Sequence, residues 1–173
     1  MISIRPATAD DVDFLVELLN DAEVEPFLAG RSARDRESIA AEVEQALADP
    51  DAAGRLVIEV DGERAGTMAW ARKNERSRIA HLGGLAVHPA FRGRRLADEA
   101  ARLLQRHLLF ERGYHRLELE CYGFNERAIR HAERAGFVRE GIKRRAYLRH
   151  GEWVDGVMFA LLREDLEPEP TEG

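Results

Sequence analysis

Hydrophobic and polar residues alternate along several short segments of the chain, which is the period of half-buried β-strands. The clearest alternation is HRLELECY, at residues 115–122. Near the end of the chain, GIKRRAYL and EWVDGVMFALL flank His150-Gly151, and Asp61-Gly62 separates two earlier hydrophobic segments. Such two-residue sequences favour the tight turns of β-hairpins. The sequence therefore predicts a hairpin around each turn, with strands at 2–7, 55–60, 63–72, 79–87 and 115–122 and in the final pair.

Other segments repeat their hydrophobic residues at the helical period and predict helices. The most regular one follows Arg95 and ends at Arg112, before Gly113. At 100° per residue its hydrophobic residues fall on one side, so this helix packs on the sheet. Polar residues suited to helix caps precede two of the others. The remaining predicted helices cover residues 10–24, 35–48 and 125–136.

Length and composition indicate one soluble domain. The 173 residues are 45% hydrophobic and 34% charged, without a hydrophobic run near the roughly 20 residues of a membrane helix. The start lacks the pattern of a signal peptide. Cys121 is the single cysteine, which excludes an internal disulfide and fits a reducing cytosol, so we expect a cytoplasmic protein without membrane contact. We place the domain at 1–164 and a disordered acidic tail at 165–173.

The segment HPAFRGRRLADEA gathers Arg92, Arg94 and Arg95 where the most regular helix begins. A helix N-terminus carries partial positive charge and repels cations, so these arginines need an explanation. A bound anion would provide one, because backbone N–H groups and guanidinium groups can act together on phosphate oxygens. The alternative is a solvated basic cluster. The net charge of −6 argues against nucleic acid as the anion.

Gly83-Gly84 lies inside the hydrophobic strand that precedes this segment. Glycine within a strand often marks a β-bulge or the close approach of another backbone. A bulge here would leave backbone groups free beside the suspected anion site, as a long ligand requires. The alternative is a pair of glycines that serves packing alone.

Together, these elements and motifs resemble the GNAT superfamily of N-acetyltransferases, from Ile4 to about Glu164. That family's motif is Arg or Gln, two variable residues, Gly, one variable residue, then Gly or Ala. RGRRLA (92–97) corresponds to it, except that Arg95 stands where the second glycine is expected. VHP before it and NERAIRHAERAGF after it strengthen the resemblance. The resemblance implies an α/β (α+β) fold, in which about four helices flank a mixed, mostly antiparallel sheet splayed at the coenzyme site.

The resemblance also implies acetyl-CoA as co-substrate, direct attack by a primary amine in a ternary complex, and no metal. Leu85, Ala86 and Val87 would offer backbone groups to the pantetheine arm and the thioester carbonyl. Asn125 matches an asparagine that contacts this arm, and it also suits a helix N-cap. The residues expected around the pyrophosphate are Arg92, Gly93, Arg94, Arg95, Leu96 and Ala97.

The attacking amine must lose a proton, and many relatives use a glutamate on the strand before the phosphate motif. The corresponding residue is His81, which suits a general base because the unperturbed imidazole pKa is near 6.5. A histidine in the pocket wall is the alternative. Many relatives also have a tyrosine seven residues after the asparagine to protonate the leaving thiolate. That position is Ala132 here, and we expect the adjacent His131 to face elsewhere.

The branch of the family with ribosomal-protein-alanine and L-amino acid acetyltransferases is the most similar, which also implies a homodimer. The acceptor is open between an N-terminal peptide, an amino acid, a polyamine and an aminoglycoside. An acidic pocket formed by Glu23, Glu25 and Glu120 would favour a polyamine. Because the expected tyrosine is missing, a non-catalytic coenzyme-A sensor is the alternative function. Cys121 is expected in the core.

Overall fold

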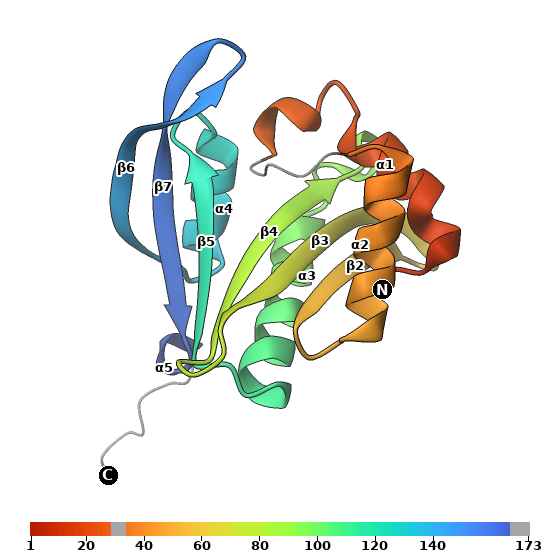
Figure 1. Cartoon of the computed structure of the whole chain (residues 1–173), viewed down its shortest axis with the longest axis horizontal. Helices are drawn as coiled ribbons and strands as arrows, with labels where there is room; N and C mark the ends of the chain where they lie inside the picture. Colours follow the sequence, from red (N-terminus) through yellow and green to blue (C-terminus); the bar gives the residue numbers. More distant parts are fainter. Residues whose placement is uncertain (29–33, 167–173) are drawn as a thin grey trace.

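The computed structural model describes residues 1–28 and 34–166, so part of the polar segment expected before the second helix lies outside it. Seven strands form one sheet in the order β1-β2-β3-β4-β5-β7-β6 (Figure 1). Along the chain the described elements are β1 (Ile2–Pro6), η1 (Ala9–Asp11), α1 (Val12–Leu19), η2 (Glu25–Phe27), α2 (Arg36–Ala48), β2 (Ala53–Val60), β3 (Glu63–Asn74), β4 (Ile79–Val87), η3 (Pro89–Phe91), α3 (Leu96–Arg106), η4 (His107–Glu111), β5 (Arg116–Tyr122), α4 (Glu126–Arg134), β6 (Val138–Arg149), β7 (Glu152–Leu162) and α5 (Arg163–Leu166).

The sheet splits in the middle, as the family resemblance implied. Every neighbouring pair of strands is antiparallel except β4 and β5, which run parallel. These two strands pair only from Ile79–Arg116 to His81–Glu118. Beyond His81, β4 continues with β3 while β5 continues with β7, so the two halves of the sheet diverge (Figure 1). The expected mixed, splayed fold is confirmed.

Helices cover both faces of the β2–β4 half. Since neighbouring residues of a strand point to opposite faces, one strand can contribute side chains to two cores. Leu56 and Ile58 on β2 join the larger hydrophobic core, which includes residues of α3. Val57, between them, joins a second core with residues of α1 and α2. Figure 1 shows α1 and α2 in front of this half and α3 behind it, with α4 behind β5. Both turns predicted from two-residue sequences are confirmed, with positive φ at 61–62 and at 150–151.

Two helices are shorter than their hydrophobic pattern predicted. The first ends at Leu19, because the Asn20 side chain donates to the carbonyl oxygen of Val16 at 2.8 Å and closes the last turn. The helix expected to reach Arg112 is α-helical only to Arg106 and then forms a π-turn. In this turn the Arg112 amide donates to the His107 carbonyl at 2.9 Å, and the consecutive residues Leu108 and Leu109 are both fully buried.

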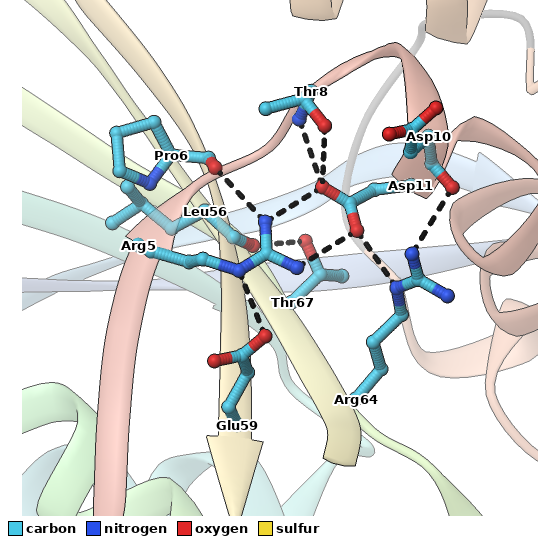
Figure 2. A network of polar contacts seen from close by, with 9 residues as sticks. All are labelled: Arg5, Pro6, Thr8, Asp10, Asp11, Leu56, Glu59, Arg64 and Thr67. Carbon is cyan, nitrogen blue, oxygen red and sulfur yellow. Dashed lines mark hydrogen bonds and ion pairs between the residues drawn. The ribbon is translucent and has the colours of Figure 1, made fainter. Parts of the chain in front are cut away.

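A buried carboxylate, Asp11, ties the N-terminal segment to the sheet (Figure 2). It accepts two hydrogen bonds from Arg5 on β1, at 2.7 and 2.9 Å, and one from Arg64 on β3 at 2.8 Å. It also accepts from the backbone amide of Thr8 at 2.8 Å, which forms the capping box of η1. Hydrogen bonding to Arg5, above all, holds the pKa of Asp11 well below its usual range. Ionisation of Asp11 therefore stabilises the folded state relative to the unfolded chain.

The boundary between the domain and its tail differs from the expectation by two residues. Asp165 and Leu166, assigned to the tail from sequence, belong to α5. The Asp165 carboxylate accepts from the Leu162 amide at 2.8 Å, and Leu166 packs against the larger core. The rest of the expected tail lies outside the described residues.

Candidate functional site

A cavity of about 840 Å³ occupies the region where β4 and β5 separate. Its walls come from the diverging strands, from the N-terminal ends of α3 and α4, and from the segment after α1. Figure 1 shows this last segment, in orange-red, reaching across the open end of the split. Nine residues predicted for coenzyme binding line the cavity: Leu85, Ala86, Val87, Arg92, Gly93, Arg95, Leu96, Ala97 and Asn125.

The β-bulge predicted at Gly83-Gly84 is confirmed. Gly83 pairs with Ala69 of β3, but the next paired residue of β4 is Ala86, opposite Thr67. Gly84 has a φ of +60°, a conformation that costs a residue with a side chain roughly 1–2 kcal/mol. Because this part of β4 has no partner strand on its β5 side, its backbone groups are open to a ligand in the cavity.

The arginine-containing turn lies at one end of the cavity. Arg92 donates from Nη2 to the carbonyl oxygen of Glu23 at 3.2 Å, so it also holds the segment after α1. Gly93 has a φ of +82°, and a Cβ placed there would meet no atom within 4 Å. Arg94 was predicted to contact the ligand, but it is not among the lining residues; its guanidinium lies 5.5 Å from the Phe91 ring. The unpaired N–H groups at the start of α3 remain beside Arg92 and Arg95.

Arg95 adopts the left-handed conformation for which relatives supply glycine, with φ 55° and ψ 28°. We expect Arg95→Gly to raise the free energy of unfolding by about 1 kcal/mol, because it removes the steric cost of a side chain at positive φ. Urea unfolding measures this difference. Arg94→Gly is the matched control: Arg94 lies one residue away without a positive φ, so the same change should destabilise the protein slightly. If the Arg95→Gly protein were less stable than the wild type, the proposed steric cost of the positive φ at Arg95 would be wrong.

Asn125, the N-cap of α4, and several residues of α4 itself line the cavity. The Asn125 side chain accepts from the Ala128 amide at 3.1 Å, so the predicted N-cap is confirmed. His131 was expected to face elsewhere, and this expectation is wrong: it lines the cavity, and its Nδ1 lies 2.8 Å from Asp98 in the first turn of α3. The pair joins the two helices that border the cavity. Ala132 is 1% exposed, so no polar group stands at the expected tyrosine position.

His81 lies at the last paired position of β4, opposite Glu118 of β5. Its side chain is exposed on the polar face and is not among the residues that line the cavity. Partial desolvation, together with the positive charge of Lys73, lowers its pKa below the ordinary 6.5, so it is neutral at pH 7. Its role as a base therefore stays a prediction. To act as the base, the imidazole would have to reach an amine bound in the cavity.

The sequence interpretation gave neither Glu120 nor Tyr147 a catalytic role. Glu120 follows Glu118 on the polar face of β5, beyond the last pairing with β4, and lines the cavity. The Tyr147 hydroxyl lies 2.8 Å from both Glu120 carboxylate oxygens, and Lys143 lies 3.1 Å from one of them. Burial and this hydrogen bond raise the pKa of Tyr147. The strand alternation placed Glu120 on the polar face, but only the hairpin geometry brings Tyr147 beside it.

Cys121 is buried, as expected, although it borders the cavity. Burial raises the pKa of its thiol to about 11, so the thiolate is absent at neutral pH and cannot act as a nucleophile. Within residues 1–28 and 34–166, three or more His, Cys, Asp or Glu side chains are nowhere arranged to hold a metal ion. In the same ranges, none of the helices is long and hydrophobic enough to cross a membrane.

Comparison with known proteins agrees with this geometry. A curated relative, the SPbeta prophage-derived uncharacterized N-acetyltransferase YokL of Bacillus subtilis (strain 168), is 34% identical over 83 residues, 48% of this chain and 47% of that protein. The chain thus matches about half the length of that relative. The spermidine N(1)-acetyltransferase of Escherichia coli (strain K12) is 24% identical over 168 residues, 94% of this chain and 86% of its own length.

Among solved structures, a spermidine N-acetyltransferase from Vibrio cholerae, crystallised with CoA and spermine, has the same fold. Its TM-score is 0.85 at 18% identity, with 95% of this chain and 96% of that chain covered. The sequence pattern of the Acetyltransferase (GNAT) family matches residues 12–137 of this chain. This range includes α1, the bulge of β4, the arginine-containing turn and α4. The chain therefore belongs to the GNAT acetyltransferase family.

Proposed function

We propose that this protein transfers an acetyl group from acetyl-CoA to a primary amine that binds at the same time. The observation that carries the proposal is one cavity that combines the bulged strand β4, without a partner on its β5 side, with an arginine-flanked helix N-terminus. Acetyl-CoA supplies the activated acetyl group as a thioester. The acceptor then needs only a site at the open side of the split and a group that takes its proton.

The residues present suit the coenzyme in three places. The open space at Gly93 lets phosphates approach the first N–H groups of α3, where Arg92 and Arg95 add positive charge. On its β5 side the backbone of β4 has no partner strand at Leu85 and Ala86, so it can hydrogen-bond there to an amide-bearing arm, as another strand would. Asn125 keeps its amide group at the cavity wall beside this arm. A volume of about 840 Å³ is within the usual range of small-molecule sites.

Glu120 is the best-placed base for the acceptor amine. Its carboxylate lines the cavity at the split, whereas His81 lies outside the lining on the neighbouring strand. The carboxylate takes the amine proton directly or through a water molecule. The Tyr147 hydroxyl holds the carboxylate in place and remains protonated at neutral pH, since its pKa is raised. Through its contact with Glu120 it is a candidate for the general acid that Ala132 does not supply, although Tyr147 itself is not among the lining residues.

The experiment that tests this function measures thiol release from acetyl-CoA over a panel of amino acids, short peptides and polyamines. Transfer releases free CoA in proportion to the acetylated amine. A coenzyme-A sensor would bind acetyl-CoA in isothermal titration and release no thiol with any amine, and that result would reject the proposed transferase. Failure to bind acetyl-CoA at all would reject both functions.

We expect Arg92→Ala to weaken acetyl-CoA binding about tenfold, because a hydrogen bond to a charged group is worth roughly 1.5–3 kcal/mol. The wild-type affinity should also fall with added salt, since part of the attraction is Coulombic. Isothermal titration measures both effects, with Arg94→Ala as the control because Arg94 does not line the cavity. Wild-type affinity for acetyl-CoA in the Arg92→Ala protein would contradict the assignment of this turn as the pyrophosphate site.

We also propose a homodimer in the cytoplasm. Four large hydrophobic side chains are exposed on the hairpin formed by β6 and β7: Val138, Ile142, Leu148 and Trp153. Exposed hydrophobic side chains of this size are candidates for a subunit contact if they form one patch. The single buried cysteine is compatible with a reducing compartment. Light scattering after size-exclusion chromatography should give twice the monomer mass of 19.6 kDa.

A further inference from the structure

Three arginines gather on the face of the sheet that carries α1 and α2. Arg55 is on β2, Arg149 is the last residue of β6, and Arg34 precedes α2. This group, which we call the arginine cluster, is not among the residues that line the cavity, but it borders that lining at Gly84. It has no part in the coenzyme contacts proposed above, so its charge needs a separate explanation.

Arg55 joins the cluster to the bulge of β4. It is only 7% exposed and pairs with Glu42 of α2 at 2.8 Å. Its Nη1 lies 3.3 Å from the Thr67 hydroxyl and 3.1 Å from the position that a Cβ would occupy at Gly84. The guanidinium group therefore lies against the part of β4 that borders the cavity.

Arg149 joins the cluster to the segment after α1. Its Nη2 donates to the Glu25 carbonyl at 3.1 Å, to the Glu25 carboxylate at 3.2 Å and to the Pro26 carbonyl at 3.3 Å. The guanidinium carbon lies 5.4 Å from the centre of the Tyr122 ring. Its Nε is buried and has no hydrogen-bond partner among the described residues. A buried N–H without a partner is costly, and an anion would satisfy it.

Arg34 leaves the cluster with more positive than negative charge. Burial lowers its pKa above all; the charge of Glu25 acts against this, and the charges of Arg149 and Arg55 lower the pKa further. Within 4 Å it has no carboxylate among the described residues, whereas Arg55 pairs with Glu42 and Arg149 pairs with Glu25. Three cations thus share two carboxylates, and the difference of one charge suits a monovalent anion such as a carboxylate.

Of the three carboxylates considered for an acidic pocket, Glu25 is already counted with the cluster, and the other two lie near cations outside it. Glu25 pairs with Arg149 at 3.2 Å, and Glu120 pairs with Lys143 at 3.1 Å. Glu23 lies 3.9 Å from Arg92. A polyamine would have to compete with these cations and would also meet the arginine cluster.

We propose that the arginine cluster binds a carboxylate of the acceptor, so that the amine at Glu120 belongs to an amino acid or a peptide rather than to a polyamine. This inference rests on the proposed acetyl transfer. The cluster borders the bulge at Gly84 on one side and the polar face of β5 on the other. An acceptor held there by its carboxylate keeps its other end at the split of the sheet, where the acetyl group is expected.

The test compares kcat/KM for matched acceptors: L-phenylalanine and L-phenylalaninamide, trialanine and its C-terminal amide, and spermidine. The wild type should favour trialanine over its amide about tenfold or more, the effect of one charged hydrogen bond. If phenylalanine is the better of the two acids, the source of the carboxylate is a free amino acid. Equal values for acids and amides, or spermidine as the best acceptor, would overturn the proposal.

Arg149→Gln and Arg34→Gln should each reduce the preference for the acid to about threefold or less. The readout is the change in the acid-to-amide ratio between variant and wild type, so differences in amine pKa cancel. Arg144→Gln is the control, because Arg144 is exposed on the same strand and should keep the wild-type ratio. Two separate variants guard against misfolding of either one. A preserved ratio in both would also overturn the proposal.

A second measurement separates this inference from the proposed function. In the presence of CoA, N-acetylphenylalanine should raise the thermal midpoint of the wild type but not of Arg149→Gln, and N-acetylphenylalaninamide should raise neither. If this pattern appears while no amine releases thiol, the arginine cluster binds carboxylates but the transferase function is wrong. If amines are acetylated without this pattern or the acid preference, the function stands and the carboxylate site is wrong.

Discussion

Glu120→Gln should lower kcat by about 10²–10⁴-fold, the usual contribution of a general base, without weakening acetyl-CoA binding. Glutamine keeps the shape of glutamate, and its carbonyl oxygen can still accept from Tyr147, which lies 2.8 Å from the carboxylate. The change therefore removes the proton acceptor while the hairpin contact remains. Steady-state kinetics with one good amine acceptor measures kcat, and isothermal titration measures acetyl-CoA affinity.

Glu118→Gln is the matched control for this experiment. Glu118 lies two residues away on the same face of β5, but it pairs with Lys73 at 2.8 Å and is not among the lining residues. Its variant should keep kcat within about threefold. If Glu120→Gln behaves like Glu118→Gln, the carboxylate at the split is not the base.

His81→Ala separates the two candidate bases. If His81 were the base, this variant would lose turnover, and the acidic limb of the pH profile would change with it. That limb would lie below pH 6.5, because desolvation lowers the pKa of His81. With Glu120 as the base, His81→Ala should keep most of its activity. The Glu120→Gln defect should shrink above about pH 9, where an α-amine arrives largely deprotonated.

Sequence patterns predicted the parts of the site that depend on local chemistry. Gly83-Gly84 indicated a bulge because glycine tolerates the irregular backbone, and the register confirms it. Asn125 indicated a helix start because its side chain can accept from the third following amide, as it does at 3.1 Å. Arg92, Arg94 and Arg95 indicated an anion site through the charge of a helix terminus alone, and that site stays a prediction.

Groups brought together by the split in the sheet could not be predicted in this way. β4 and β5 pair over only three residues, and nothing in either sequence marks His81 as the last paired position. Whether His81 or Glu120 reaches the cavity depends on that register. Tyr147 meets Glu120 only because β6 folds back on β7, 27 residues along the chain.

The resemblance predicted ligand contacts for every residue from 92 to 97, whereas in the structure one of these six residues does not line the cavity. Arg94 and Arg95 are neighbours in the motif, yet only Arg95 lines the cavity. The difference follows from the backbone: positive φ at Gly93 and again at Arg95 turns the chain into α3. The expectation for His131 was wrong because its orientation depends on Asp98, which lies on another helix and is not its neighbour in sequence.

Asp11→Asn should lower the free energy of unfolding by about 2–3 kcal/mol at pH 7. The substitution keeps the shape of the side chain but removes the charge that Arg5 and Arg64 share (Figure 2). Hydrogen bonds to a charged group are worth roughly 1.5–3 kcal/mol, and Asp11 is 0% exposed. The loss stays below that of a fully buried pair, because both arginines reach solvent in part and can be rehydrated.

The pH dependence provides an independent check on Asp11. Its folded pKa lies below the unfolded value near 3.9, so its stabilising effect is complete well above pH 4 and decreases as the pH falls. The difference between wild type and Asp11→Asn should therefore be largest at pH 6–7 and shrink toward pH 3. Urea unfolding at both pH values measures it, and Asp13→Asn, an exposed carboxylate in the first turn of α1, is the control. A difference that stays constant with pH would show that the lost stability does not come from the ionised carboxylate.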